Sequence, residues 1–236
     1  PPMKVVINQS NYLPWKGYFD LIHDADLFIF HDDLQYTKND WRNRNRVKAV
    51  HGAEWITIPA GSDCNRLICE VELKDAGWQE KHWRTLQQNY GTCPHFARYR
   101  AFFEEVYRGR RWTMLSELNH FLIRHIAHEF LGITTAFADS RSFALGGQKQ
   151  DRLLELLDRV GTQRYVSGPA ASSYIEPERF AALGIALVWK DYAGYPEYPQ
   201  RFPPFEHGVT ILDLLFNVGP DAPWYIWGWR DGPLGS

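Results

Sequence analysis

Short apolar runs that end in polar turns alternate with amphipathic segments in the first and last parts of this chain of 236 residues. Such runs are typical of buried strands, and apolar spacings of three and four are typical of helices. We expect strands at 4–9, 27–31, 54–59, 68–73, 135–139, 165–167 and 185–189, and helices at 17–23, 149–160, 178–183 and 210–218. This alternation predicts an α/β fold with a mostly parallel sheet flanked by helices.

The middle of the chain has a different pattern. Three segments in succession, 78–90, 94–107 and 113–131, have helical spacing, and Gly132 follows the last of them as a stop signal. Because the α/β pattern then resumes, we expect residues 1–75 and 133–231 to form the α/β core. Residues 76–132 would form a helical insertion, or lid, that covers the site. The last five residues, 232–236, are typical of a cloning remnant and take no part in the predicted fold.

The composition argues against several classes of protein. The net charge of -2, from 26 basic and 28 acidic side chains, gives no electrostatic basis for binding nucleic acid. We expect no membrane span, since no apolar run approaches eighteen residues, and no secretory signal is visible. Three cysteines do not predict a disulfide framework, so we expect a cytoplasmic protein. The many aromatic side chains favour a pocket for a flat or sugar-like ligand.

Polar and aromatic side chains directly follow the first two predicted strands. Ligands of open α/β sheets bind beyond the carboxyl ends of the strands, so we predict a ligand site here. A carboxylate in such a site can accept a proton, and a glutamine amide both donates and accepts. Alternatively, the carboxylates cap turns and the aromatic rings fill the core. The group consists of Gln9, Asn11, Tyr12, Trp15, Asp32, Asp33, Gln35 and Tyr36.

A second group combines cations with amides. Four cations occupy alternate positions from Arg42 to Lys48, next to Trp41 and Asn43. The planar guanidinium of arginine suits phosphate or carboxylate. A nucleotide, a phosphopantetheine arm or a sugar diphosphate would therefore fit, and a solvated strand face is the structural alternative.

Two further features are candidates for chemistry. Ser167 and Gly168 open a loop of small residues that runs to Tyr174, where a ligand could approach the backbone closely. His82 lies one helical turn after Trp78 and is a candidate general base, although a histidine on a helix is commonly a plain packing residue.

One long helix also carries several metal-ligating side chain types. We expect no metal there, because spacings of five and three do not bring two histidines to one face in the way that HExxH does. The side chains are His120, His125, His128 and Glu129.

Several motifs together suggest a family. They are the run Gln-Ser-Asn-Tyr-Leu-Pro-Trp-Lys-Gly-Tyr-Phe at 9–19, Asp-Asp-Leu-Gln-Tyr at 32–36, Trp41 with Asn43-Arg44, 55–59, Trp78 with His82 and Tyr90, 167–169, 198–200 and 211–217. In these motifs the chain resembles the WbqC-like family over residues 4–219. Where that family often has His-Gln-Pro, this chain has Asn8-Gln9-Ser10, so no role for that imidazole carries over. The family's association with O-antigen and specialised-metabolite gene clusters implies small-molecule or sugar modification.

The combined hypothesis is a transferase. It would move an acyl or aminoacyl group from a carrier-protein or CoA thioester to an amine or hydroxyl of a sugar or related metabolite, with an acyl carrier protein as partner. Asp33 or His82 would act as base, and Gln9 and Asn43 would orient the carbonyl. Arg42 and Arg44 would hold the donor phosphate. Such a reaction needs positioning and a base, so no cofactor is expected.

Two alternatives stay open. A fainter likeness to nucleotidyltransferases with a HIGH-type signature, such as pantothenate synthetase, favours an ATP-dependent adenylating ligase that binds ATP at 167–173. The histidine pair of that signature is absent between Tyr12 and Tyr18. The third hypothesis is a non-catalytic scaffold of a biosynthetic complex. All sites proposed here require Gln9, Asp33 and Ser167 to meet at one hollow.

Overall fold

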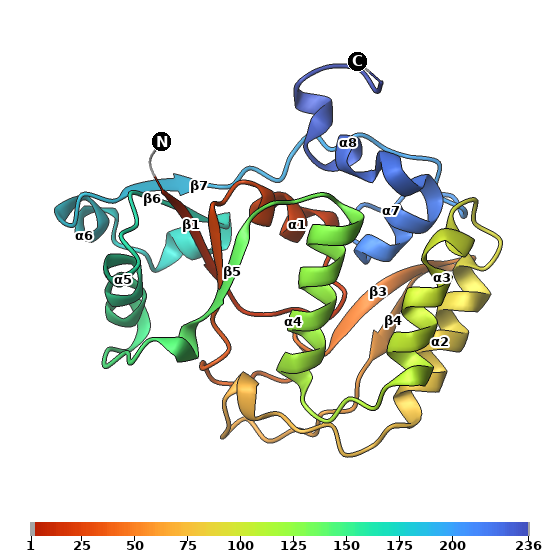
Figure 1. The fold of residues 1–236 in the computed structure, drawn as a ribbon, viewed down its shortest axis with the longest axis horizontal. Coiled ribbons are helices and arrows are strands. Elements are labelled where there is room, and N and C mark those ends of the chain that lie inside the picture. Colours follow the sequence, from red (N-terminus) through yellow and green to blue (C-terminus); the bar gives the residue numbers. More distant parts are fainter. Residues whose placement is uncertain (1–2, 236) are drawn as a thin grey trace.

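A single parallel sheet organises the molecule (Figure 1). In the computed structural model, which describes residues 3–235, its strands are β1 (Lys4–Asn8), β2 (Leu27–Phe30), β5 (Ala136–Asp139), β6 (Arg164–Ser167) and β7 (Ala186–Trp189). Their spatial order is β5-β2-β1-β6-β7, and every neighbouring pair is parallel. The chain builds the sheet outward from β1 in one direction and then in the other. The order therefore reverses between β1 and β6, and the predicted α/β fold is confirmed.

The helices cover both faces of the sheet. Successive strand side chains point to opposite faces, so Val6 and Phe28 meet one set of helices while Val5 and Ile29 meet the other. The first face packs against α1 (Lys16–His23) and α4 (Leu115–His125), which continues into the π-helical turn η3 (Ile126–Phe130). The second face packs against α5 (Lys149–Arg159) and α6 (Pro177–Ala182).

A hairpin and further helices enlarge the first layer. The hairpin joins β3 (Arg44–Ala49) to β4 (Gly52–Thr57). Beside it lies α2 (Gly77–Tyr90), which contacts α3 (Phe96–Glu104) and the π-helical turn η2 (Glu105–Gly109). In turn α3 contacts α7 (Ile211–Val218), and α8 (Ala222–Ile226) contacts α7 and α1 (Figure 1). Short 3-10 turns complete the described elements: η4 (Ser140–Ser142), η5 (Pro169–Ser173), η6 (Gly219–Asp221) and η7 (Gly228–Arg230).

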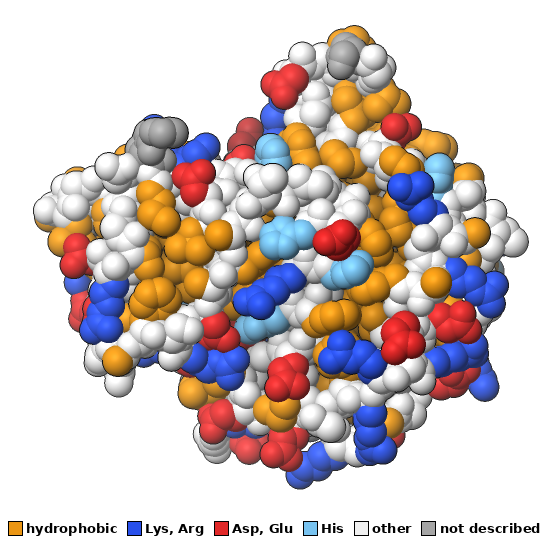
Figure 2. Space-filling view, in the orientation of Figure 1, with side chains coloured by type: hydrophobic (Ala, Val, Ile, Leu, Met, Phe, Trp, Pro, Cys, Tyr) orange, Lys and Arg blue, Asp and Glu red, His pale blue; other side chains and the backbone are white. Residues whose placement is uncertain are grey.

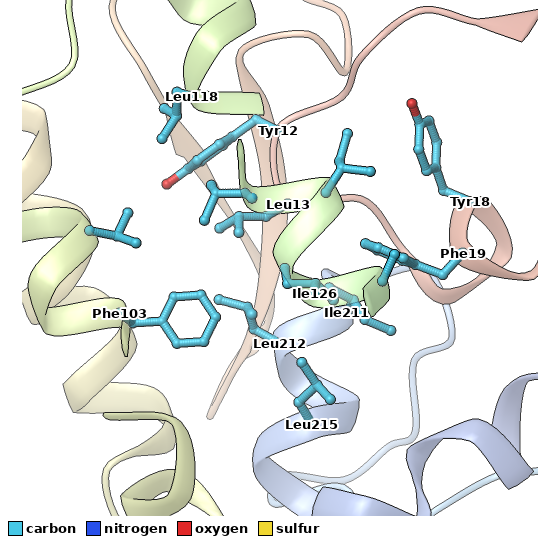
Figure 3. Close-up of a cluster of buried hydrophobic side chains, with 14 of the residues drawn as sticks. Tyr12, Leu13, Tyr18, Phe19, Phe103, Leu118, Ile126, Ile211, Leu212 and Leu215 are labelled. Atoms are coloured by element: carbon cyan, nitrogen blue, oxygen red, sulfur yellow. The ribbon is translucent and has the colours of Figure 1, made fainter. Parts of the chain in front are cut away.

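One hydrophobic cluster joins the middle helices to the rest of the chain. Phe103 of α3 and Leu118 of α4 point toward Tyr12, Leu13 and Leu212 in the close-up of Figure 3. Residues of 76–132 thus share a core with residues of 1–75 and 133–231, and the separate behaviour of a lid stays a prediction.

The strand expected at 68–73 is wrong. Ile68–Glu70 forms the 3-10 turn η1, because the Ile68 amide donates to the Leu34 carbonyl and the Glu70 carboxylate accepts from the Leu67 amide. Only an isolated bridge between Glu72 and Met114 follows. Within residues 3–235, no helix combines the length and the apolar character needed to cross a bilayer.

Candidate functional site

The end of β2 directs two neighbouring carboxylates to different parts of the molecule. Asp33 forms an ion pair with Arg152 of α5 and accepts a hydrogen bond from Ser140. Asp32 points toward α4, where it accepts hydrogen bonds from Ser116 Oγ (2.8 Å) and His120 Nε2 (2.8 Å). This divergence follows from the alternation of side chains along an extended backbone.

Asp32 is a buried, ionised carboxylate that fixes His120. It also accepts hydrogen bonds from the Ser10 backbone amide (2.8 Å) and hydroxyl (2.6 Å). Burial by itself raises the pKa of Asp32, but the hydrogen bond and charge of His120 and the two bonds from Ser10 outweigh it, so the pKa lies below its usual value. The ring of His120 stacks on Phe30 with centroids 3.9 Å apart. Both contacts hold the imidazole in one orientation.

In its neutral form, His120 has one ring nitrogen that can accept a proton. Because Nε2 donates to Asp32, Nδ1 carries the free lone pair. Within residues 3–235, Nδ1 makes no hydrogen bond. The side chain of His120 is 11% exposed and lines a cavity of about 580 Å³, which we call the histidine cavity. Its other lining residues are Arg110, Trp112, Glu117, Phe121, Arg124, His125, His128, Glu129 and Asp139.

Two arginines of the histidine cavity are available to an anion. The guanidinium of Arg110 lies over Trp112, 4.0 Å from the ring centroid, and that of Arg124 lies 5.6 Å from the centroid of Phe30. Neither forms an ion pair with a carboxylate in the described part of the chain. Histidine, basic and acidic side chains gather at the middle of the face that α4 occupies (Figure 2).

A second cavity lies where the sequence places a ligand site, beyond the carboxyl ends of β1 and β2. We call it the crevice cavity; its volume is about 600 Å³. Gln9, His31 and Tyr174 line it. Asp33 does not line it but lies next to His31, with 3.8 Å between an Asp33 oxygen and His31 Nε2. Ser167 does not line this cavity. Its buried hydroxyl donates to the Gly168 carbonyl at 3.3 Å. Gly168 itself lies beside Tyr192.

A third cavity, of about 300 Å³, involves three more of the predicted residues. Asn11, Trp15 and Trp41 line it together with Asn45, Arg46 and Gly208. The arginines predicted to hold phosphate contact other protein groups. The buried guanidinium of Arg42 donates to Asn11 and to the Ser10 carbonyl. That of Arg44 lies 4.1 Å from the ring centroid of Trp55 and donates to the Asn39 carbonyl. These contacts give the buried Arg42 a packing role, and phosphate binding by the half-buried Arg44 stays a prediction.

The predicted base His82 lies in the core. It is 2% exposed, Tyr12 OH lies 2.8 Å from its Nδ1, and its Nε2 lies 3.0 Å from the Thr57 carbonyl. Burial lowers the pKa of His82 to about 4, so the neutral ring donates to Thr57 and accepts from Tyr12. The structure therefore gives His82 and the buried Tyr12 a packing role in place of the predicted roles in catalysis and binding.

Two other predicted binding residues also serve the fold. The buried side chain of Asn43 donates from Nδ2 to the Ile58 carbonyl at 2.8 Å, and Gln35 on the surface donates to the Cys64 carbonyl at 3.0 Å. Sequence reasoning missed the pairing of Asp32 with His120, because 88 residues separate the two and no local spacing connects them. Among the described residues, no group of three histidine, cysteine or acidic side chains is arranged to hold a metal.

Comparison with known proteins agrees with the motifs. The model of the WbqC-like protein family matches residues 9–225. The chain is similar to a protein of Mycobacterium tuberculosis (strain ATCC 25618 / H37Rv) described as uncharacterized protein Rv1507c, with 45% identity over 225 residues that cover 94% of this chain and 97% of that protein. No solved structure matches significantly. The chain therefore belongs to the WbqC-like protein family.

Proposed function

We propose that the protein is a transferase in which His120, held by Asp32, acts as the general base. It would move an acyl or aminoacyl group from a thioester to an amine or hydroxyl of a sugar or related metabolite. One observation carries this proposal: an imidazole hydrogen-bonded to a buried carboxylate faces a cavity with two arginines that pair with no carboxylate among residues 3–235. A cytoplasmic location, which the three free cysteines favour, belongs to the same proposal.

The geometry suits base-assisted acyl transfer. Nδ1 of His120 takes the proton of the acceptor as its nitrogen or oxygen attacks the thioester carbonyl, and the Asp32 carboxylate stabilises the imidazolium that results. The imidazolium then returns the proton to the departing thiolate. A positioned base of this kind contributes roughly 10²- to 10⁴-fold to a rate.

The arginines support an anionic donor. Arg110 and Arg124 would bind the phosphate of a phosphopantetheine arm, which a carrier protein and CoA share, because guanidinium groups pair well with phosphate oxygens. Trp112 and Phe121 provide apolar surface for the arm in the same cavity. This assignment replaces Arg42 and Arg44 of the sequence-based hypothesis.

Thiol release tests the proposal. Acetyl- and glycyl-phosphopantetheine, which contain no nucleotide, are incubated with amino sugars, and the free thiol is measured over time. We expect His120→Ala and Asp32→Asn each to lower the acceptor-dependent rate by about 100-fold or more. His51→Ala, which removes a histidine from an exposed turn, serves as the matched control and should leave the rate unchanged.

Two results would contradict the proposal. One is a wild-type rate in His120→Ala with the fold intact by circular dichroism. The other is turnover that requires ATP and releases pyrophosphate, which would favour the adenylating ligase. Binding of acetyl-phosphopantetheine to Arg110→Ala and Arg124→Ala, measured by calorimetry, tests the donor assignment separately.

A further inference from the structure

The crevice cavity takes no part in the chemistry proposed for His120. It lies where the order of the parallel strands reverses between β1 and β6, and α5 supplies its other wall. In open α/β sheets, this position is the preferred place for a ligand. We propose that the crevice cavity binds a nucleoside phosphate as a second ligand.

Unused polar groups in the cavity support a ligand with hydrogen-bond acceptors and negative charge. The side-chain amide of Gln9 and the ammonium group of Lys149 both line the cavity. Within residues 3–235, neither forms a side-chain hydrogen bond or an ion pair. Gln9 is half-buried, and polar groups in that environment are normally paired, so its amide is available to a ligand. Lys149 is exposed at the edge of the cavity, where its ammonium group can meet a ligand from solvent.

The charge balance of the cavity favours an anion. Arg152 and Asp33, which do not line the cavity, form an ion pair with each other, so their charges cancel. Burial lowers the pKa of His31, so this lining residue is neutral near pH 7. The charge of Lys149 therefore dominates the lining, and a phosphate near its ammonium group would be attracted.

The rest of the lining suits a flat ring. Ile7, Leu34, Leu153 and Ile175 form apolar walls. Tyr174 is 69% exposed although it lines the cavity, so its ring is available to stack on a base. A volume of about 600 Å³ lies within the range of cavities that hold small-molecule ligands, ~300–1,000 Å³. An apolar slot, an exposed ring and the ammonium group of Lys149 together match a base linked to a phosphate better than they match a sugar alone.

Calorimetry with AMP, ADP, ATP and UDP tests this inference, with adenosine and inorganic phosphate as half-ligands. We expect at least one nucleotide to bind more tightly than either half. Lys149→Glu should weaken that binding by tenfold or more, and Tyr174→Ala should weaken it by several-fold. Lys81→Ala, which removes an exposed lysine of α2, is the matched control and should bind like the wild type.

Three outcomes would overturn the inference: no nucleotide binding at millimolar concentration, equal binding of inorganic phosphate alone, or unchanged affinity in Lys149→Glu with the fold intact by circular dichroism. The two proposals can fail separately. Nucleotide binding should persist in His120→Ala, whereas thiol release from acetyl-phosphopantetheine does not depend on a nucleotide.

Discussion

A one-residue step along the chain separates the two proposed sites. Asp32 turns toward α4 and fixes His120, whereas the next residue, Asp33, turns toward α5 and pairs with Arg152. The sequence places both carboxylates correctly at the end of a strand. It does not reveal the partner of either carboxylate, because both partners lie on helices about 90 to 120 residues further along.

His82 predicts a pH dependence of stability. Its pKa is about 4 in the folded protein and about 6.5 in the unfolded chain, so the unfolded chain binds the proton more readily. The free energy of unfolding should therefore fall as the pH drops from about 6.5 to about 4, by roughly 3 kcal/mol from this residue. Urea unfolding at pH 7, 5 and 4 measures the loss.

Comparison of variants isolates the contribution of His82. In His82→Gln the loss between pH 7 and 4 should be smaller than in the wild type, because the titrating group is absent. His51→Ala should keep the wild-type dependence, since His51 is exposed. Equal pH dependence in His82→Gln and the wild type would show that the ring titrates normally.

At the scale of elements, a buried carboxylate holds α7 in place. All eight residues of α7 are buried, and Asp213 accepts hydrogen bonds from Tyr90 OH (2.9 Å), Tyr198 OH (2.5 Å) and Gln200 Nε2 (2.8 Å). Asp213→Ala leaves these donors without their acceptor, and each unpaired buried group costs about 1–3 kcal/mol. We expect a loss of about 3 kcal/mol or more in urea unfolding. Asp221→Ala, at an exposed position after the helix, should lose less than about 0.5 kcal/mol.

The observed helices and strands show which sequence patterns are sufficient to predict an element. Thr210, at the start of the helix expected at 210–218, accepts from the Leu212 amide as N-cap, and the runs at 4–9 and 27–31 contain β1 and β2. Local residue patterns determine caps and buried strands. The alternation at 68–73 misleads, since a strand needs a neighbouring strand and this segment hydrogen-bonds to the Leu34 carbonyl instead. The alternating cations from Arg42 to Lys48 fit the structural alternative of a strand, since β3 begins at Arg44 and side chains between them, such as Val47, are buried.

At the scale of the molecule, hydrogen bonds and ion pairs of Asp20 hold the C-terminal segment against α1. Its buried carboxylate accepts two hydrogen bonds from Arg230 (2.8 and 2.9 Å) and lies 3.2 Å from Lys190 Nζ. Burial raises the pKa of Asp20, but hydrogen bonds from Arg230 and Tyr195 and the charge of Lys190 lower it below the usual value. This contribution to stability is thus present above the ordinary pKa of aspartate and is lost at more acidic pH.

Asp20→Ala should therefore destabilise the protein and loosen its C-terminal segment. The variant leaves Tyr195 OH and the partly exposed Arg230 without their acceptor, whereas Lys190 keeps its ion pair with Asp24, so we expect a loss of about 1–3 kcal/mol. Urea unfolding measures that loss, and limited proteolysis should cut the chain after Gly219 sooner than in the wild type. Asp158→Ala, on the exposed side of α5, should change neither result. Wild-type stability of Asp20→Ala would show that solvent screens this pair.

The shared core also predicts how the whole molecule unfolds. Phe103, Leu118 and Ile126 of the middle helices pack into the same cluster as Leu212 and Leu215 of α7 (Figure 3). Separation of residues 76–132 would expose these side chains, at about 25 cal/mol for each Å² of apolar surface. We therefore expect one cooperative transition in urea, with coincident curves from far-ultraviolet circular dichroism and tryptophan fluorescence.

Tryptophans on both sides of the cluster make this experiment decisive. Trp78, Trp83 and Trp112 belong to residues 76–132, and the other seven tryptophans lie in the rest of the chain. If the helical segment were an independent lid, fluorescence and circular dichroism would give different midpoints, and mild proteolysis would release a fragment near residues 76–132. Because His120 lies on α4 while Asp32 lies at the end of β2, such independence would also separate the proposed base from the carboxylate that orients it.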